Sequence, residues 1–378
     1  MDPQALVDPG ASTGAVPAPL WFVVFFKVLG FTLHAWPMSL WYAGLPLALG
    51  LHAVAGENGR RLGTRLMRQM PVIIAFGVNL GIVPLLFIQL AYYKVFYPAT
   101  ILMAWYWLGI VALLTLAYYG VYAYAMGLSE TGDGLSGWRR AAGWAAAVCF
   151  LAIGLLFANA MSLMARVENW PELWRATSTA GAPRGTALNL ADPTLWPRWL
   201  LMFGLAIATT AAWVFLDAAF FAARETDRYR AWARRFAPKL YTLGLLVGAA
   251  AGAWYVFGTW SDELRRAMFT TPTVVLTAAT AAAPGAVWLL LLAGSRSGGG
   301  HVAAALVALA QLATLALNAV SRQIVQHLEL RPFFDPLAAP TDVQYGPLAM
   351  FLVVFVLGLG VVGWMVTQTV RAAKARTT

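Results

Sequence analysis

Residues 20–55 read LWFVVFFKVLGFTLHAWPMSLWYAGLPLALGLHAVA, and this apolar stretch decides the fold of the chain. It is longer than the roughly 20 residues that a helix needs to cross the ~30 Å hydrocarbon core of a bilayer. Pro37 and Pro46 lie inside it, and each proline removes one backbone amide donor. The carbonyls that lose their donors, those of Leu33 and Tyr42, must be covered by neighbouring helices, because the bilayer core holds no water. The stretch therefore predicts a kinked membrane-spanning helix buried in a bundle.

The composition of the whole chain is that of a membrane protein. Of its 378 residues, 60% are hydrophobic and 11% are charged, and the mean hydropathy is +0.67. The formal net charge is +10, but Lys and Arg occur in short clusters between apolar runs, a pattern of membrane topology rather than of nucleic-acid binding. The single cysteine, Cys149, lies in an apolar run, which excludes a disulfide framework and a thiolate zinc site. We expect an all-α polytopic helix bundle in a lipid bilayer, with no nucleic-acid partner.

Nine apolar runs are long enough to cross a bilayer. They lie at about residues 20–55, 70–97, 99–127, 138–165, 196–223, 238–260, 271–294, 301–328 and 345–370. We expect residues 20–370 to form a single transmembrane helical domain, followed by a basic cytoplasmic tail at residues 371–378. Residues 1–19 lack the basic region of a signal peptide, so they are expected to form an uncleaved extracytoplasmic tail.

The distribution of Lys and Arg between the connections predicts the orientation, because cytoplasmic loops carry the excess of these residues. One side holds about twice as many as the other, and its clusters lie at residues 60–68, 139–140, 224–239, 296 and 371–376. The poorer side carries mainly Arg166, Arg175, Arg184, Arg198, Arg265, Arg266, Arg322 and Arg331. An odd number of spans puts the termini on opposite sides. We expect a multi-pass protein of the bacterial inner membrane with its N-terminus outside and its C-terminus in the cytoplasm.

His34 is an ionisable side chain near the middle of residues 20–55. An ionisable group at membrane depth is costly, so it is a functional candidate that faces protein or a cavity. A neutral imidazole is also a frequent ligand of haem iron. The alternative is a core histidine hydrogen-bonded to one of the carbonyls freed by Pro37 and Pro46. The residues alone leave both interpretations open.

The other histidines and deep charges are weaker candidates. His52, His301 and His327 lie at the ends of spans, where interfacial roles are expected, and His327 has charged neighbours in sequence. Lys27 and Asp217 each lie about two turns from the end of a span, within reach of snorkelling, and nothing in the sequence supports a relay between them.

Other features are open to a structural or a functional interpretation. The aromatic clusters at residues 92–97 and 105–107 are more typical of an interfacial belt or packing than of a quinone site. The outside segments at about 166–195 and 327–347 are either partner contacts or merely ordered loops.

Three short motifs are spread over most of the chain. GVNLGIVPLLFIQ occupies residues 77–89, ANAMSLM residues 158–164 and NAVSRQ residues 318–323. Together with nine spans and an outside N-terminus, they resemble subunit I of the cytochrome bd quinol oxidases. The resemblance implies that His34 is a haem axial ligand, with the haem iron as its metal. It also marks Gln89, Arg322, Gln323 and the nearby His327 as cofactor-binding residues.

The chain departs from this family at several positions. Arg198–Trp199 stands near the place of a haem-ligating histidine, Trp107 and Thr115 near the third-helix glutamates, and Ala319 in place of a further glutamate. The quinol-binding loop is missing, since residues 224–239 form only a short basic connection. A standard quinol oxidase with three haems is therefore not expected, and no residue is assigned a catalytic role.

The resemblance implies an integral subunit of a respiratory electron-transfer complex, with at most one haem b. Such a subunit, non-catalytic or carrying a single haem, would organise c-type cytochrome subunits. Its further partners would be a second bd-like subunit and a quinone. Two alternatives stay open. A transporter or channel-like bundle would need repeats with helices broken near the midplane, and a quinol-oxidising enzyme with one b-type haem would need ligands outside the aligned positions.

Overall fold

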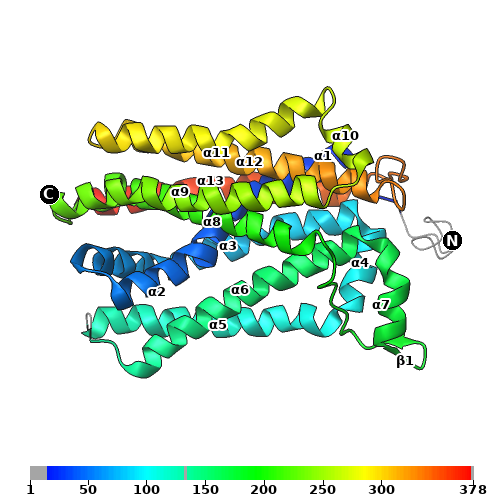
Figure 1. Cartoon of the computed structure of the whole chain (residues 1–378), viewed down its shortest axis with the longest axis horizontal. Helices are drawn as coiled ribbons and strands as arrows, with labels where there is room; N and C mark the ends of the chain where they lie inside the picture. Colours follow the sequence, from blue (N-terminus) through cyan, green and yellow to red (C-terminus); the bar gives the residue numbers. More distant parts are fainter. Residues whose placement is uncertain (1–14, 132–133, 376–378) are drawn as a thin grey trace.

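A computed structural model describes residues 15–131 and 134–375. These residues form an all-α bundle whose long helices run side by side along the long axis of the molecule (Figure 1). A short antiparallel hairpin pairs β1 (Ser178–Thr179) with β2 (Ala182–Pro183). The expected all-α fold class is confirmed. Most of the expected N-terminal tail and the last residues of the basic tail lie outside the described residues.

Eight described helices are long and apolar enough to cross a membrane. They are α1–η2–α2 (Leu20–Val54), α3 (Glu57–Ala91), α5 (Ala104–Thr131), α6 (Gly137–Ala165), α8–η4 (Leu195–Phe221), α9 (Asp227–Gly258), α11 (Thr273–Arg296) and α12 (His301–Leu330). The ninth expected span corresponds to α13 (Tyr345–Ala375), within which Tyr345–Val361 is a shorter apolar helix. By helix length and hydropathy the chain is therefore a multi-pass membrane protein, and eight of its nine expected spans correspond to helices of spanning length.

Several expected boundaries are wrong, because polar turns extend the helices beyond their apolar runs. α3 begins at Glu57 rather than near residue 70, and α9 begins at Asp227 rather than near residue 238. The short helix α4 (Tyr93–Leu102) separates α3 from α5 and contains Pro98, so the second and third spans do not divide at that proline. Counting apolar residues cannot locate a helix end that is amphipathic.

The stretch that begins the bundle keeps its helical path past its first proline. α1 (Leu20–Ser39) passes through Pro37, and a π-helical turn, η2 (Leu40–Gly44), follows before α2 (Leu45–Val54). π-helical turns are rare, and they occur mostly as single turns inside α-helices, where they are one of the causes of a kink. All the residues of η2 are buried, which agrees with the expectation that this stretch lies inside the bundle.

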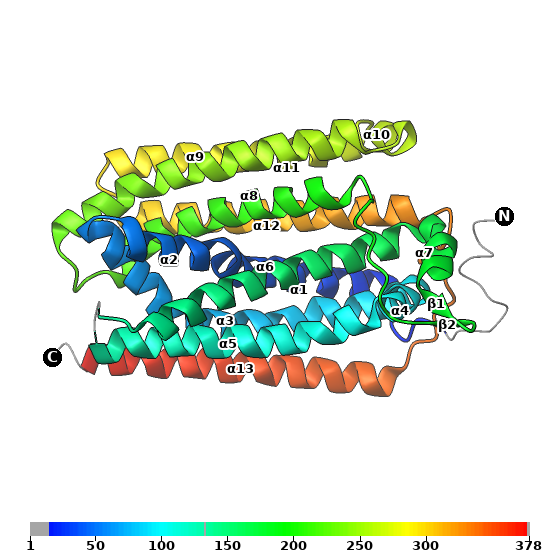
Figure 2. The ribbon, with the colours of Figure 1, turned by 60° about the horizontal axis from the view of Figure 1, so that its bottom comes forward.

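The two ends of the bundle differ. One end, here the capped end, carries α4, η3 (Val167–Asn169), α7 (Trp170–Thr177), the hairpin, α10 (Asp262–Met268) and residues 331–344 (right-hand side of Figures 1 and 2). The opposite, arginine-rich end holds the starts of α3 and α9. Successive connections alternate between these ends, as the expected succession of spans requires. Which end faces the cytoplasm stays a prediction.

Small residues bring α8 (Leu195–Leu216) against α9. A Cβ atom added to Gly204 would lie 2.4 Å from the backbone nitrogen of Gly248, and one added to Gly244 would lie 2.5 Å from that of Ala208. Such close backbone approach is the usual way in which membrane helices gain packing energy without a hydrophobic driving force. The seam fixes the first turn of α8 beside the last turns of α9, at the capped end.

The N-terminal end of the described chain meets the loop before α13 (Tyr345–Ala375) at the capped end. The backbone nitrogen of Val16 donates to the Pro340 carbonyl at 2.8 Å, and that of Asp342 donates to the Val16 carbonyl at 3.0 Å. The helix α13 then runs along the outside of the bundle (Figure 2). Its Phe351 and Phe355 rings each lie 5.3 Å from the Phe26 ring, centroid to centroid, in edge-on contacts.

Large apolar side chains cover the outward faces of the long helices. Examples are Trp21 at 72% exposed, Val111 at 66%, Leu246 at 64% and Leu309 at 65%. Continuous apolar surface on this scale is covered by lipid or by other membrane helices in a protein of this class. A lipid bilayer is therefore a partner of this chain.

Candidate functional site

Three basic side chains from three helices gather at one depth inside the capped end. Lys27 lies about two turns from the start of α1, Arg198 lies in the first turn of α8, and Arg322 lies about two turns before the end of α12. Arg322 is within Coulombic range of both Lys27 and Arg198. We call Lys27, Arg198 and Arg322 the buried cationic cluster.

Lys27 is only 9% exposed, and its contacts are with neutral groups. Its Nζ donates to Gln323 Oε1 at 2.6 Å and to Gln326 Oε1, and it lies 4.6 Å from the centroid of the Tyr92 ring. Amide oxygens and an aromatic face stabilise an ammonium group without cancelling its charge. Lys27 therefore brings a basic group to the cluster, and none of these contacts is a carboxylate.

Tyr92 orients one of these amides. It lies at the break between α3 and α4, and its hydroxyl accepts a hydrogen bond from Gln323 Nε2 at 2.7 Å. This contact turns Gln323 Oε1 toward Lys27. Burial raises the pKa of Tyr92 to about 12, so its phenol stays neutral and supplies no counter-charge to Lys27.

Arg322 is surrounded by apolar and sulfur groups. Its guanidinium carbon lies 4.4 Å from the centroid of the Phe31 ring, and its Nη1 donates to Met202 Sδ at 3.7 Å. A thioether is a weak acceptor, and a ring face is a weak counter-charge. Arg322 therefore keeps most of its hydrogen-bonding capacity unused.

Within the described structure, Arg198 is the residue of the cluster with a buried, unsatisfied hydrogen-bond donor. Its Nη1 atom is sealed from solvent and has no hydrogen-bond partner among the described residues. The Nε1 atom of the neighbouring Trp199 is in the same condition, as is that of Trp36, which packs against the same small core group as Phe31 and Met202. These three atoms are donors, and the buried Asn318 Oδ1 on α12 is an acceptor in the same condition.

Two buried carboxylates, those of Asp192 and Glu329, lie near the cluster, but Asp192 already has hydrogen-bond and ion-pair partners. Asp192 accepts from Ser162 Oγ and Thr194 Oγ1 and lies 3.5 Å from Arg166 Nε. Glu329, whose side chain is 8% exposed, lies 4.0 Å from Arg166 Nη2 and within Coulombic range of Arg198. Positive charge thus exceeds negative charge in this region of the described structure.

The structure brings together some of the residues expected from the sequence and separates others. Arg322 and Gln323 lie in or directly beside the cluster. His327 lies toward its rim, with Nε2 3.7 Å from Asp335 Oδ1. Gln89 is engaged elsewhere, because it donates to the Leu85 carbonyl of its own helix and accepts from Tyr97.

His34 lies in a tight seam between α1 and α3. Its Nδ1 is 2.8 Å from the Gly77 carbonyl oxygen, and because a carbonyl only accepts, Nδ1 carries the proton. A Cβ atom on Gly81 would lie 2.7 Å from His34 Cε1, so the imidazole rests on the backbone of α3. The carbonyl acceptors expected from the helix of His34 itself are not used, since the carbonyl that Nδ1 contacts belongs to α3.

The residues around His34 do not fit a haem. About one turn away on α1, a Cβ on Gly30 would lie 2.8 Å from Pro84 Cδ, and a Cβ on Gly77 would lie 2.1 Å from the Trp41 ring. The two helices are therefore in close contact on both sides of the imidazole, where a porphyrin plane would have to pass. We therefore do not place a haem at His34. The single haem b stays a prediction of the resemblance.

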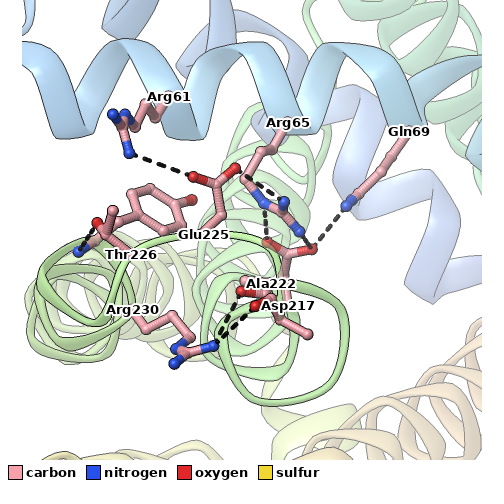
Figure 3. A network of polar contacts seen from close by, with 10 residues as sticks. Arg61, Arg65, Gln69, Asp217, Ala222, Glu225, Thr226 and Arg230 are labelled. Atoms are coloured by element: carbon pink, nitrogen blue, oxygen red, sulfur yellow. Dashed lines mark hydrogen bonds and ion pairs between the residues drawn. The ribbon is translucent and has the colours of Figure 1, made fainter. Parts of the chain in front are cut away.

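A second polar network lies at the arginine-rich end (Figure 3). Asp217 begins the π-helical turn η4 (Asp217–Phe221) and is 1% exposed. Arg65 donates to both of its carboxylate oxygens, from Nε at 2.7 Å and from Nη2 at 2.8 Å, and Gln69 Nε2 adds a third bond at 2.7 Å. Arg65 Nη1 also reaches Glu225 Oε1 at 3.3 Å. We call Arg65, Gln69, Asp217 and Glu225 the carboxylate network.

This network corrects two interpretations. Asp217 does not snorkel, because it is buried and neutralised by Arg65. A relay between Lys27 and Asp217 has no geometric basis, since the partners of Lys27 lie on α12 at the capped end and those of Asp217 lie on α3 at the arginine-rich end. The signal that sequence reasoning missed was the spacing of Arg61, Arg65 and Gln69, which puts them on one face of a helix.

Across residues 15–131 and 134–375, no group of three or more His, Cys, Asp or Glu side chains is arranged to hold a metal ion. No protein-family model matches the chain, and a search of curated proteins finds no match. The resemblance to the cytochrome bd large subunit therefore rests on its short motifs alone.

Proposed function

We propose that this chain is an integral membrane protein that binds an anion at membrane depth, between α1, α8 and α12. The observation that carries this proposal is Arg198 Nη1, a charged donor that is sealed from solvent without a partner among the described residues. The ligand is a carboxylate, phosphate or sulfate group held by Arg198 and Arg322, with Lys27 beside them.

The energetics favour a ligand of this charge. A buried charged donor without a partner costs at least about 1–3 kcal/mol, and like charges that repel one another in a medium of low dielectric add to that cost. A bound anion accepts a hydrogen bond from the buried donor, and its negative charge offsets the repulsion between the positive charges. A guanidinium group donates in a planar fork that matches the two oxygens of a carboxylate or the edge of a phosphate, which explains the use of two arginines rather than two lysines.

The neutral donors nearby fit the same ligand. The indole nitrogens of Trp36 and Trp199 are buried and unpaired within the described structure, and Trp36 packs against the same small core group as Phe31 and Met202, which contact Arg322. Oxyanions accept hydrogen bonds from such N–H groups. A cationic ligand would be repelled by Arg198 and Arg322, so the same geometry disfavours cation binding.

The test is a thermal unfolding series on the detergent-purified full chain. Acetate, phosphate and sulfate are compared with chloride at matched ionic strength, so that screening is constant. We expect one of the oxyanions to raise the Tm of the wild type and to lose this effect in Arg198→Gln. The exposed Arg175→Gln at the same end is the matched control and should respond as the wild type does.

Two outcomes would overturn the proposal: a wild type that no oxyanion stabilises, or an Arg198→Gln protein that responds in full. Arg198→Lys keeps the charge but loses the fork, so it should bind the anion more weakly without the disruption of a neutral replacement. Uptake of the anion into sealed liposomes would assign the chain to the transporter class, whereas binding without uptake would indicate a fixed site.

A second proposal is the role that the resemblance implies, an integral subunit of an electron-transfer complex that organises c-type cytochrome partners. It is favoured by one observation: Arg322 and Gln323, which belong to one of the shared motifs, meet Lys27 and Tyr92 in three dimensions. Purification from native membranes in a mild detergent, followed by an optical spectrum and mass spectrometry of the co-purified subunits, tests it. Co-purified cytochromes would support the proposal, and a haem-free preparation without partners would contradict it.

A further inference from the structure

The arginine-rich end contains a second feature that the proposed function does not use. A cavity of about 510 Å³ opens beside the carboxylate network and is lined by Arg60, Arg61, Arg65 and Arg68, with Glu57 and Glu225. Arginines outnumber carboxylates in this lining, and they still do so when Asp217, which lies behind it, is counted.

The helical repeat explains how one segment supplies all four arginines. Residues 60, 64 and 68 form one row along α3, and residues 61, 65 and 69 form the adjacent row. The second row is held in place by carboxylates, because Arg61 pairs with Glu57 at 2.9 Å and Arg65 pairs with Asp217. No carboxylate among the described residues pairs with the first row: Arg60 is exposed, and Arg68 donates to the Leu128 carbonyl at 3.1 Å.

The position of the cavity matches the headgroup level of a bilayer. Its arginines precede the apolar part of α3, so they lie where the membrane-spanning segment ends. Exposed aromatic side chains occupy the same end of the bundle, including Phe221 at 59% exposed in η4 and Trp138 at 62% at the start of α6. Aromatic residues at this level are typical of a membrane interface.

We propose that this arginine pocket binds the phosphate group of an anionic lipid. Arg60 and Arg68 supply guanidinium donors for phosphate oxygens, and the ion-paired Arg61 and Arg65 add positive charge to the same cavity. Basic pockets between membrane helices are suited to phospholipid headgroups, and the exposed Phe221 provides an apolar surface for an acyl chain. A soluble phosphate ion would gain the first contact but not the second, which is why the lipid is favoured.

The experiment measures lipid retention by the detergent-purified full chain. Native mass spectrometry is performed after addition of phosphatidylglycerol, phosphatidylcholine or inorganic phosphate at equal concentration. We expect phosphatidylglycerol adducts to dominate. In the variant Arg60→Gln/Arg68→Gln, phosphatidylglycerol affinity should fall about tenfold, which corresponds to about 1.4 kcal/mol. Both substituted residues lie outside the carboxylate network, so the fold is expected to survive.

Two further variants of the chain serve as controls in this experiment. Arg235→Gln removes an exposed charge from α9 at the same end without touching the cavity, so it should retain phosphatidylglycerol as the wild type does. Arg60→Lys/Arg68→Lys keeps the charge and should lose only part of the affinity. Equal retention by wild type and the double glutamine variant would overturn the site. Equal binding of inorganic phosphate and phosphatidylglycerol would overturn the lipid as its occupant.

Discussion

Arg65 and Asp217 form a two-point ion pair, with guanidinium-to-carboxylate distances of 2.7 and 2.8 Å between helices that are 152 positions apart in sequence. The Asp217 side chain is 2% exposed and that of Arg65 is 17% exposed. The pair joins α3 to the end of the α8–η4 helix at the arginine-rich end. It is the contact on which the geometry of the carboxylate network depends.

The first prediction concerns this pair. Replacing Arg65 with Leu leaves a buried carboxylate whose charge is no longer cancelled, and loss of one partner of a buried pair typically costs about 3–5 kcal/mol. We expect Arg65→Leu to lower the free energy of unfolding strongly, measured by SDS titration in mixed micelles. Arg61→Gln, at a side chain that is 38% exposed, is the control and should cost less than about 1 kcal/mol.

A double variant tests whether the uncompensated charge of Asp217 causes the loss of stability in Arg65→Leu. In Arg65→Leu/Asp217→Leu both charges are gone, so part of the stability should return relative to Arg65→Leu alone. If the double variant is no more stable than the single one, the loss comes from packing and not from the uncompensated charge.

The second prediction concerns the seam between α1 and α3. A methyl group at Gly81 would lie 2.7 Å from His34 Cε1, so Gly81→Ala must push the two helices apart or displace the ring. We expect a clear loss of thermal stability, with partial recovery in Gly81→Ala/His34→Ala, where the smaller side chain makes room. Gly285→Ala on α11 is a suitable control, since nothing lies within 4 Å of its added Cβ. Additive effects of the two seam substitutions would show that the ring and the glycine do not pack on one another.

The third prediction separates His34 from haem binding. Because Nδ1 bonds to the Gly77 carbonyl and the ring rests on α3, we expect His34→Leu to leave the b-type haem content of the preparation unchanged, whatever that content is. The pyridine haemochrome assay on matched amounts of folded protein measures it. Loss of haem on this substitution would restore His34 as an axial ligand and would show that the seam opens when haem binds.

The fourth prediction concerns orientation. Cysteines placed at Ser129 and Thr226, at the arginine-rich end, should be protected from a membrane-impermeant thiol reagent in intact cells, because the Lys and Arg excess predicts that this end is cytoplasmic. Cysteines at Thr179 and Ala339, at the capped end, should react. Cys149 is replaced by Ser in every protein as the common background. The reverse labelling pattern would invert the assignment of the two ends.

The sequence predicted the spans well because the signal for a membrane helix is local. Residues 20–55 carry enough apolar side chains to identify a span without knowledge of its neighbours. The start of α3 was missed because Arg60, Arg61, Arg65 and Arg68 were treated as loop charges, although they lie on a helix whose polar face binds Asp217 and Glu225. A polar helical turn and a polar loop have similar compositions.

The candidate site was predicted only in part, for a physical reason. Arg322 and Gln323 were identified through a motif, but their meeting with Lys27 spans nearly the whole chain and depends on how α1 packs against α12. Arg198 drew attention only as a departure from the resembled family, because an unpaired Nη1 atom is a property of the packed bundle. No local pattern in the sequence contains that information.

The contact between Lys27 and Gln323 also constrains how the protein is made. The two residues are 296 positions apart, so at about 5–20 residues per second Lys27 leaves the ribosome on the order of 15–60 s before its amide partners are synthesised. During that interval the Lys27 side chain enters the membrane with α1 but without its amide partners. The long side chain must extend to the interface so that its ammonium group remains hydrated. We therefore expect the Lys27 side chain to reach its final position only after α12 has been inserted, when Gln323 and Gln326 can replace its water contacts.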